Sequence, residues 1–164
     1  MFTEEIIKNL APKPIVFAMS NPEPEIRPEV AKRIRDDIIM ATGRSDYPNQ
    51  INNVMCFPFL FRATLDCRAT EINETMKMAT AKCLADLVKQ PLPDDIKKSQ
   101  EARGKATEYG PEYIIPNPFD PRLVQELPVA IVKAAIESGV AQQEIADYDE
   151  YRKELKKISD ANSF

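Results

Sequence analysis

Asparagine side chains follow two apolar segments of the chain, close to where each segment ends. Asn21 comes shortly after the apolar residues 14–19, and Asn52 and Asn53 end the loop "GRSDYPNQINN" that follows a second apolar run. A carboxamide offers both a donor and an acceptor to one partner, such as a substrate carboxylate or the amide of a nicotinamide. The pattern therefore raises the hypothesis of a ligand site built from these amides.

Each segment also has a purely structural interpretation. An Asn before a Pro commonly ends a strand with an Asx turn, in which the side-chain oxygen accepts a backbone N–H two residues on. The second loop can be a polar surface loop whose residues cap one another, and its Arg44 and Asp46 can pair to hold it open or remain solvated. Composition favours the turn for Asn21 until the second loop is considered.

Two parallel strands are predicted to hold these loops. Residues 14–19, "PIVFAM", form a continuous apolar run, which is typical of a parallel strand covered on both faces. Pro28 is expected to begin a helix in "RPEVAKRIR", and "DIIMATG" is the next strand. Strand, helix and strand make one βαβ unit of an α/β fold. The carboxyl ends of both strands then lie at one edge of the sheet, where open α/β sheets bind ligands.

Helices are predicted for much of the remaining chain. Pro58 is expected to start one in "PFLFRATLDCR", so that Asn52 and Asn53 lie near its positive end, which favours anions. Thr70 is expected to cap the next helix, whose apolar stripe comprises Ile72, Met76, Ala79, Cys83 and Leu87. "KKSQEARGKATEYG" is interpreted as a polar surface segment. Further helices are expected over residues 121–138, ended by Gly139, and over residues 142–157.

The composition excludes several kinds of chemistry. The chain has no His, which removes Ser-His-Asp and Cys-His catalysis and His-based metal sites. It has four glycines and no Gly-rich phosphate loop, and no carboxylates are spaced as a metal-binding set. The three cysteines, Cys56, Cys67 and Cys83, are expected to be reduced thiols. Any chemistry of this chain must therefore use carboxylates, Lys, Tyr or a cofactor.

Charge and hydropathy limit the partners. The net charge is −4 with both signs interspersed, so nucleic acid is not an expected partner. No apolar stretch approaches the roughly 20 residues of a membrane span. The first residues, "MFTEEIIKNL", are acidic where a targeting segment is basic, which favours a cytoplasmic location.

Four motifs together resemble the C-terminal part of the NAD(P)-binding domain of bacterial malic enzymes, in particular the NADP type. They are "IVFAMSNPEPEIRPEVA", "ATGRSDYPNQINNV", "CFPFLFRATLDCRATEINETMKMA" and "GPEYIIPNPFDPRL". The resemblance implies a partial doubly wound, Rossmann-like parallel sheet followed by C-terminal helices. It assigns residues 1–140 to that domain and residues 141–164 to a helical tail. The chain is then expected to be one portion of a longer protein.

The resemblance also implies an activity, the oxidative decarboxylation of (S)-malate to pyruvate and CO₂ with NADP or NAD and Mg²⁺ or Mn²⁺. Asn21, Asn52 and Asn53 match the family's asparagines that contact malate and the nicotinamide end. The family's acid Tyr, base Lys, metal-binding carboxylates and Gly-rich loop lie upstream of these motifs, so the isolated chain is expected to be inactive. A homo-oligomer is expected from the family, and the choice between NAD and NADP stays open.

A second hypothesis belongs to a different class of function. The chain can be a non-catalytic oligomerisation or scaffold remnant of the same fold, which keeps the C-terminal helices but binds no malate. A sheet of only two parallel strands exposes edges and apolar faces that another surface must cover. Another NAD-linked 2-hydroxyacid dehydrogenase is disfavoured, because such enzymes generally rely on a catalytic His.

Overall fold

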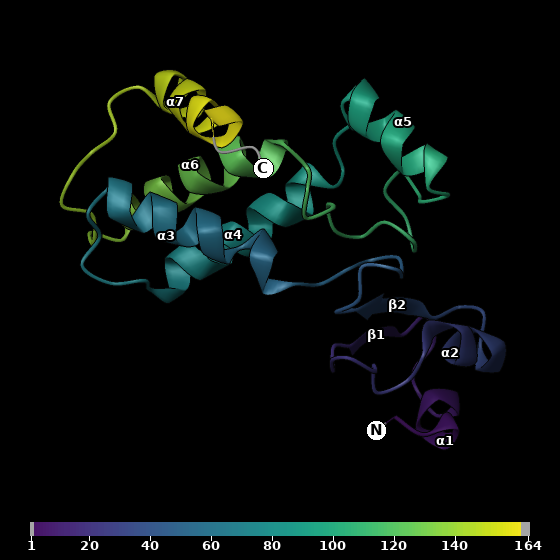
Figure 1. Ribbon diagram of the computed structural model, residues 1–164. Coiled ribbons are helices and arrows are strands. Elements are labelled where there is room, and N and C mark those ends of the chain that lie inside the picture. Colours follow the sequence, from purple (N-terminus) through teal and green to yellow (C-terminus); the bar gives the residue numbers. More distant parts are fainter. Residues whose placement is uncertain (1, 162–164) are drawn as a thin grey trace. The chain divides into compact units, whose positions relative to one another are not determined.

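The chain divides into two compact units in a computed structural model that describes residues 2–161 (Figure 1). Unit 1 comprises Met1–Asn52 and Val88–Asn117, and unit 2 comprises Asn53–Leu87 and Pro118–Phe164. Each unit is thus assembled from two separate stretches of sequence. The boundary predicted at residue 140 stays a prediction.

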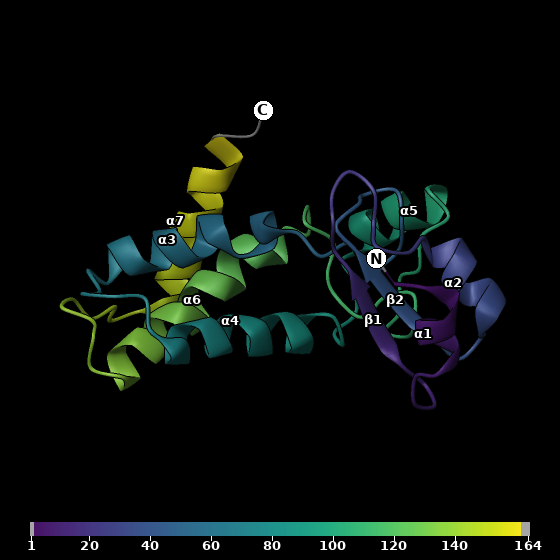
Figure 2. The ribbon, with the colours of Figure 1, turned by 90° about the horizontal axis from the view of Figure 1, so that it is seen from below.

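Unit 1 contains the predicted parallel strands. Its elements are α1 (Glu4–Lys8), β1 (Ile15–Ala18), α2 (Pro28–Ile34), β2 (Ile39–Thr42) and α5 (Asp94–Ala102). Within residues 2–161 the sheet has two strands, and β1 pairs with β2 in parallel, with Ile15 opposite Ile39 and Ala18 opposite Thr42 (Figure 2). Pro28 is the first residue of α2, as expected for a residue with a fixed φ and no N–H. The prediction of a strand, a helix and a parallel strand is confirmed.

The prediction that the first strand is covered on both faces is wrong for β1. Val16 and Ala18 are buried, whereas the exposed fractions of Ile15 and Phe17 are 62% and 45%. The buried face packs on a core that also contains Ile7 of α1 and Ala31 of α2. Because these short helices cover one face of β1, its other apolar face remains exposed in the described chain.

Unit 2 is helical and is organised around α6. Its elements are η1 (Asn53–Met55), α3 (Phe57–Asp66), α4 (Glu74–Leu87), α6 (Arg122–Glu137) and α7 (Tyr148–Ala161). Helix α6 packs against α3, α4 and α7 (Figures 1 and 2). Leu123, Leu127 and Ile131 of α6 are fully buried, which explains why this helix lies at the centre. The Tyr151 hydroxyl of α7 donates to Asp66 of α3 over 2.6 Å.

Some helix boundaries differ from the predictions. Thr70 does not cap α4; its N–H donates to the Val140 carbonyl, and Asn73 caps the helix by accepting from the Met76 N–H at 3.0 Å. The tail helix begins at Tyr148 rather than at residue 142, because Asp147 accepts the N–H groups of its first turn. The predicted end of α6 is confirmed by Gly139, whose φ of 74° suits a glycine.

The sequence predicts no helix at α5, because the segment that starts at Lys97 has the pattern of a polar surface segment. The helix begins directly after Pro93 and carries mostly polar side chains, of which Gln100 is buried. Among residues 2–161, no helix combines the length and the apolar character needed to cross a membrane.

Candidate functional site

The loops that follow β1 and β2 meet at the carboxyl edge of the sheet. The first loop (residues 19–27) contains Asn21, and the second loop (residues 43–52) begins with the buried Gly43. A Cβ placed on Gly43 would lie 2.9 Å from Asn21 Nδ2 and 3.1 Å from Asn21 Oδ1. The two strand ends therefore bring these residues into direct contact, and the predicted meeting of the two loops at one edge is confirmed.

The Asn21 side chain does not form the Asx turn that was its structural alternative. Such a turn needs a hydrogen bond from the Glu23 N–H to the Asn21 side-chain oxygen. Within residues 2–161, the Asn21 carboxamide has no hydrogen-bond partner, although it packs on Gly43 and the side chain is exposed. The Asn21–Pro22 peptide bond is cis. Both the donor and the acceptor of this amide are thus available to a ligand.

Arg44 links the two loops. Its guanidinium forms a two-point ion pair with Asp46, with N–O distances of 2.9 and 2.7 Å, so of the two alternatives, pairing and solvation, the structure shows pairing. A third donor, Nη1, reaches the Pro22 carbonyl at 3.2 Å. The guanidinium also lies over the Tyr47 ring, 5.4 Å from its centroid. The pairing with Arg44 lowers the pKa of Asp46, so both partners are charged near neutral pH.

Asn49 is a structural asparagine that the sequence did not distinguish from its neighbours. It is 6% exposed, and its Nδ2 donates to the carbonyls of Met40 at 2.9 Å and Pro111 at 2.7 Å. Its Oδ1 accepts from the Ile114 N–H at 2.9 Å. The backbone φ of 54° is one that Asn tolerates better than most residues. Asn49 therefore fastens the second loop to residues 111–114.

Asn52 and Asn53 are both exposed and lie at the end of the second loop. Asn52 closes unit 1, and Asn53 begins η1 in unit 2. The Asn53 carbonyl accepts from the N–H of Cys56, the residue before α3, and Pro58 lies in the first turn of that helix. The predicted place of these amides before a helix is confirmed, but the ligand-binding role of all three asparagines stays a prediction.

Other reactive side chains are committed to structure. Arg62 pairs with Asp66 one helical turn further along α3, with Nε 2.7 Å from a carboxylate oxygen. The three cysteines are free thiols, and burial raises the pKa of each, to about 11 for Cys83. A high pKa disfavours the nucleophilic thiolate. None of these groups is arranged as a nucleophile with a base.

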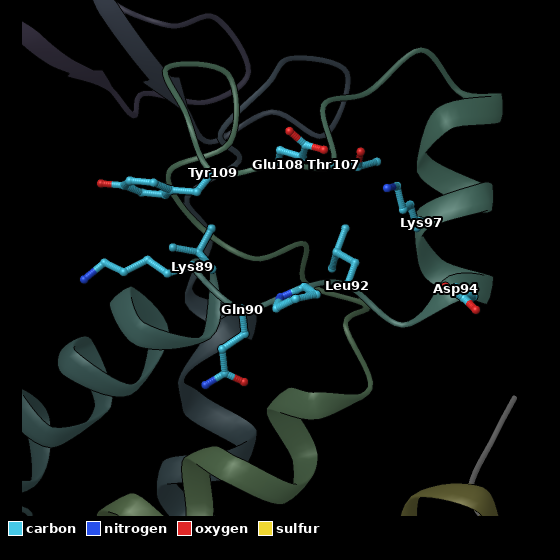
Figure 3. A pocket seen from close by; sticks show the side chains of 10 residues that line it. Lys89, Gln90, Leu92, Asp94, Lys97, Thr107, Glu108 and Tyr109 are labelled. Carbon is cyan, nitrogen blue, oxygen red and sulfur yellow. The ribbon is translucent and has the colours of Figure 1, made fainter.

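A separate hollow of about 360 Å³ lies in unit 1, between the residues before α5 and residues 107–109 (Figure 3). Lys89 and Lys97 are balanced there by Asp94 and Glu108. Since its charges cancel, this hollow does not have the electropositive character of a phosphate site. None of the three candidate asparagines lines it.

Parallel strands with their following loops joined at the carboxyl edge define part of an α/β ligand-binding domain. A family model described as "Malic enzyme, NAD binding domain" matches residues 1–98. The chain therefore belongs to the malic enzyme family and contains part of its NAD-binding domain.

Individual relatives agree with this family. An NADP-dependent malic enzyme of Rhizobium meliloti is 51% identical over 92% of this chain, and one of Escherichia coli is 50% identical over 92%. The chain spans 20% of the length of each of these relatives. The crystal structure of a malic enzyme from Pyrococcus horikoshii is similar to 98% of this chain, with 35% sequence identity and a TM-score of 0.77. The matched part is 33% of the Pyrococcus chain.

Proposed function

We propose that this chain supplies the malate and nicotinamide contacts of an NAD(P)-dependent malic enzyme. The reaction is the oxidative decarboxylation of (S)-malate to pyruvate and CO₂. Membership of the malic enzyme family supports the activity. The observation that carries the site is the Asn21 carboxamide, which lies at the carboxyl edge of the sheet without a hydrogen-bond partner among residues 2–161.

Each unit, taken by itself, offers groups that suit malate or the nicotinamide end of the cofactor. A carboxamide such as that of Asn21 can donate to a malate carboxylate and accept from the nicotinamide amide. The exposed Asn52 and Asn53 precede α3, whose N-terminal dipole favours a carboxylate. The four glycines include no Gly-rich loop, so the diphosphate is held by residues outside this chain. When bound, NAD(P) accepts a hydride from C2 of malate.

The same residues do not fit a divalent metal site. Among residues 2–161, no group of three or more His, Cys, Asp or Glu side chains could hold a metal ion. Because the chain spans 20% of the length of its Rhizobium and Escherichia coli relatives, the proposal assigns the Mg²⁺ or Mn²⁺ ligands, the acid and the base to the part of the enzyme that this chain does not span. The relatives include both NADP-dependent and NAD-dependent malic enzymes, and the proposal covers either cofactor.

We further propose that the enzyme is a cytoplasmic homo-oligomer. Two elements each carry more than one exposed apolar side chain. They are β1, with Ile15 and Phe17, and α3, with Phe57, Phe61 and Leu65. Apolar groups of this size are generally covered by another protein surface. The three free thiols suit a reducing compartment.

The decisive experiment restores the missing part of the enzyme. In the Escherichia coli relative, the matching segment is replaced by this chain, and malate-dependent NADP⁺ reduction is measured with Mg²⁺ or Mn²⁺. We expect an active chimera, an inactive isolated chain, and a fall in kcat/KM of at least about 10-fold for Asn21→Ala, Asn52→Ala and Asn53→Ala. Asn9→Ala, an exposed residue that ends α1, is the matched control and should leave kcat/KM unchanged.

The outcomes separate the alternatives. If Asn21→Ala and Asn53→Ala leave kcat/KM unchanged, the site assignment is wrong. Turnover by the isolated chain would contradict the division of the active site. A chimera that assembles like the parent enzyme but turns over no malate would favour the scaffold function instead.

A further inference from the structure

We infer that Gly43 and Arg44 are positioning residues that hold the Asn21 carboxamide in place for its ligand, an inference that rests on the proposed function. Asn21 lies in an exposed loop, where a side chain without hydrogen bonds is normally mobile. Three contacts restrain it without occupying its donor or its acceptor. A binding site requires an amide whose position is restrained while its donor and acceptor remain unoccupied.

The first contact is the surface of Gly43 itself. A Cβ at this position would meet Asn21 Nδ2 at 2.9 Å, Asn21 Oδ1 at 3.1 Å and the Met19 carbonyl at 3.3 Å. Both polar atoms of the amide therefore lie close to the position that a Cβ on residue 43 would take, which glycine leaves open. A methyl group here collides first with the end of a side chain, which can move. Alanine should therefore displace the amide while the strands remain paired.

The other contacts fix the backbone on both sides of Asn21. Before it, the Ser20 N–H donates to Glu25 Oε2 at 3.1 Å. After it, the Pro22 carbonyl accepts from Arg44 Nη1 at 3.2 Å, and Glu23 lies 3.5 Å from the same nitrogen. The ion pair with Asp46 engages Nε and Nη2 of Arg44 and sets the direction of the guanidinium. Lysine cannot reproduce this set, because it has no planar fork of donors.

Asn49 provides an internal comparison within the second loop. Its amide is immobilised by three hydrogen bonds and has no group left for a ligand. Asn21 is restrained by packing and by its neighbours' hydrogen bonds instead. The NMR order parameter of the Asn21 side-chain amide should therefore approach that of the Asn49 amide, and it should depend on Gly43 and Arg44.

The first test uses NMR on the full 164-residue chain. In the wild type, the Asn21 side-chain amide protons should give NOEs to the Gly43 α-protons, with an order parameter above about 0.6. Gly43→Ala should shift the amide resonances and remove these NOEs, and Arg44→Lys should lower the order parameter below about 0.6.

Matched controls separate displacement from general damage. Gly110→Ala adds the same methyl group where the nearest atom is 3.9 Å away. Arg33→Lys makes the same change at an exposed arginine that bonds within α2. Both controls should leave the Asn21 amide as in the wild type. If Gly43→Ala and Arg44→Lys also leave it unchanged, the inference is wrong.

The second test measures kcat/KM in the chimera described above. We expect Gly43→Ala to lower it by about 10- to 100-fold, since a displacement near 1 Å can cost that much. The loss should not add to that of Asn21→Ala, because both act through one amide. If the double variant Asn21→Ala/Gly43→Ala lost kcat/KM by the product of the two single losses, the inference would be wrong. An inactive chimera or a harmless Asn21→Ala would instead defeat the proposed function, while the NMR result decides whether Gly43 and Arg44 order the amide.

Discussion

Replacing Asn49 with alanine should destabilise unit 1 by about 4 kcal/mol. The change removes three hydrogen bonds, to Met40, Pro111 and Ile114, each worth about 1 kcal/mol net. It also places alanine at a φ of 54°, which adds about 1–2 kcal/mol for a residue with a Cβ. A loss of this size is a large part of the 5–15 kcal/mol that stabilises a typical domain.

The assay is urea unfolding of the chain, followed by the intensities of assigned backbone amide peaks in each unit. The amides of Ile51 and Ile114 should lose intensity at lower urea in Asn49→Ala, whereas those of α6 should change less. Asn49→Gly should be less damaging than Asn49→Ala by about 1 kcal/mol, because glycine adopts a positive φ without strain.

Asn9→Ala provides the control, since Asn9 is exposed and ends α1. Its effect should stay within about 0.5 kcal/mol, as for most surface substitutions. A loss below about 1 kcal/mol for Asn49→Ala would refute the argument that this buried amide fastens residues 111–114 to the second loop.

Three further predictions concern pH and backbone conformation. Burial raises the pKa of Tyr151 to about 12, so its contribution to stability is complete below pH 10 and should disappear as the pH rises towards 12. Tyr151→Phe should cost about 1–2 kcal/mol at neutral pH and flatten this alkaline decline in urea titrations. The hydrogen bond from Ser20 lowers the pKa of Glu25 below its ordinary 4.5. The first loop should therefore loosen as the pH falls below that value, seen as faster exchange of the Ser20 amide; unchanged exchange would contradict this. Gly139→Ala, at a φ of 74°, should destabilise unit 2 by about 1–2 kcal/mol in urea unfolding. An unchanged urea midpoint would show that alanine is not strained at this position.

Local sequence signals predicted much of the fold. Pro28 begins α2 and Gly139 follows the end of α6, as their restricted or permissive φ angles require. Where two suitable residues lay close together, the pattern could not choose between them. Thr70 and Asn73 are both good capping residues, but Thr70 is bonded to Val140, far along the chain, so Asn73 caps α4.

The missed helix and the exposed strand face have a different cause. In α5 the buried face includes Gln100, a polar residue that does not contribute to an apolar stripe. In β1 the continuous apolar run predicted cover on both faces, yet Phe17 is 45% exposed. A run of apolar residues reports what a strand can bury, whereas the neighbouring elements decide what it does bury.

By itself, the sequence determined the parallel strand pair, the asparagines after its strands, and the motifs that resemble malic enzymes. Only the tertiary structure distinguished the amides from one another. Asn49 is bonded to residues 111–114, whereas Asn21 rests on Gly43 with its donor and acceptor free within residues 2–161. The physical reason is distance along the chain. Strand and helix signals depend on residues a few positions apart, but the partner of a buried amide is chosen by packing between segments far apart in sequence.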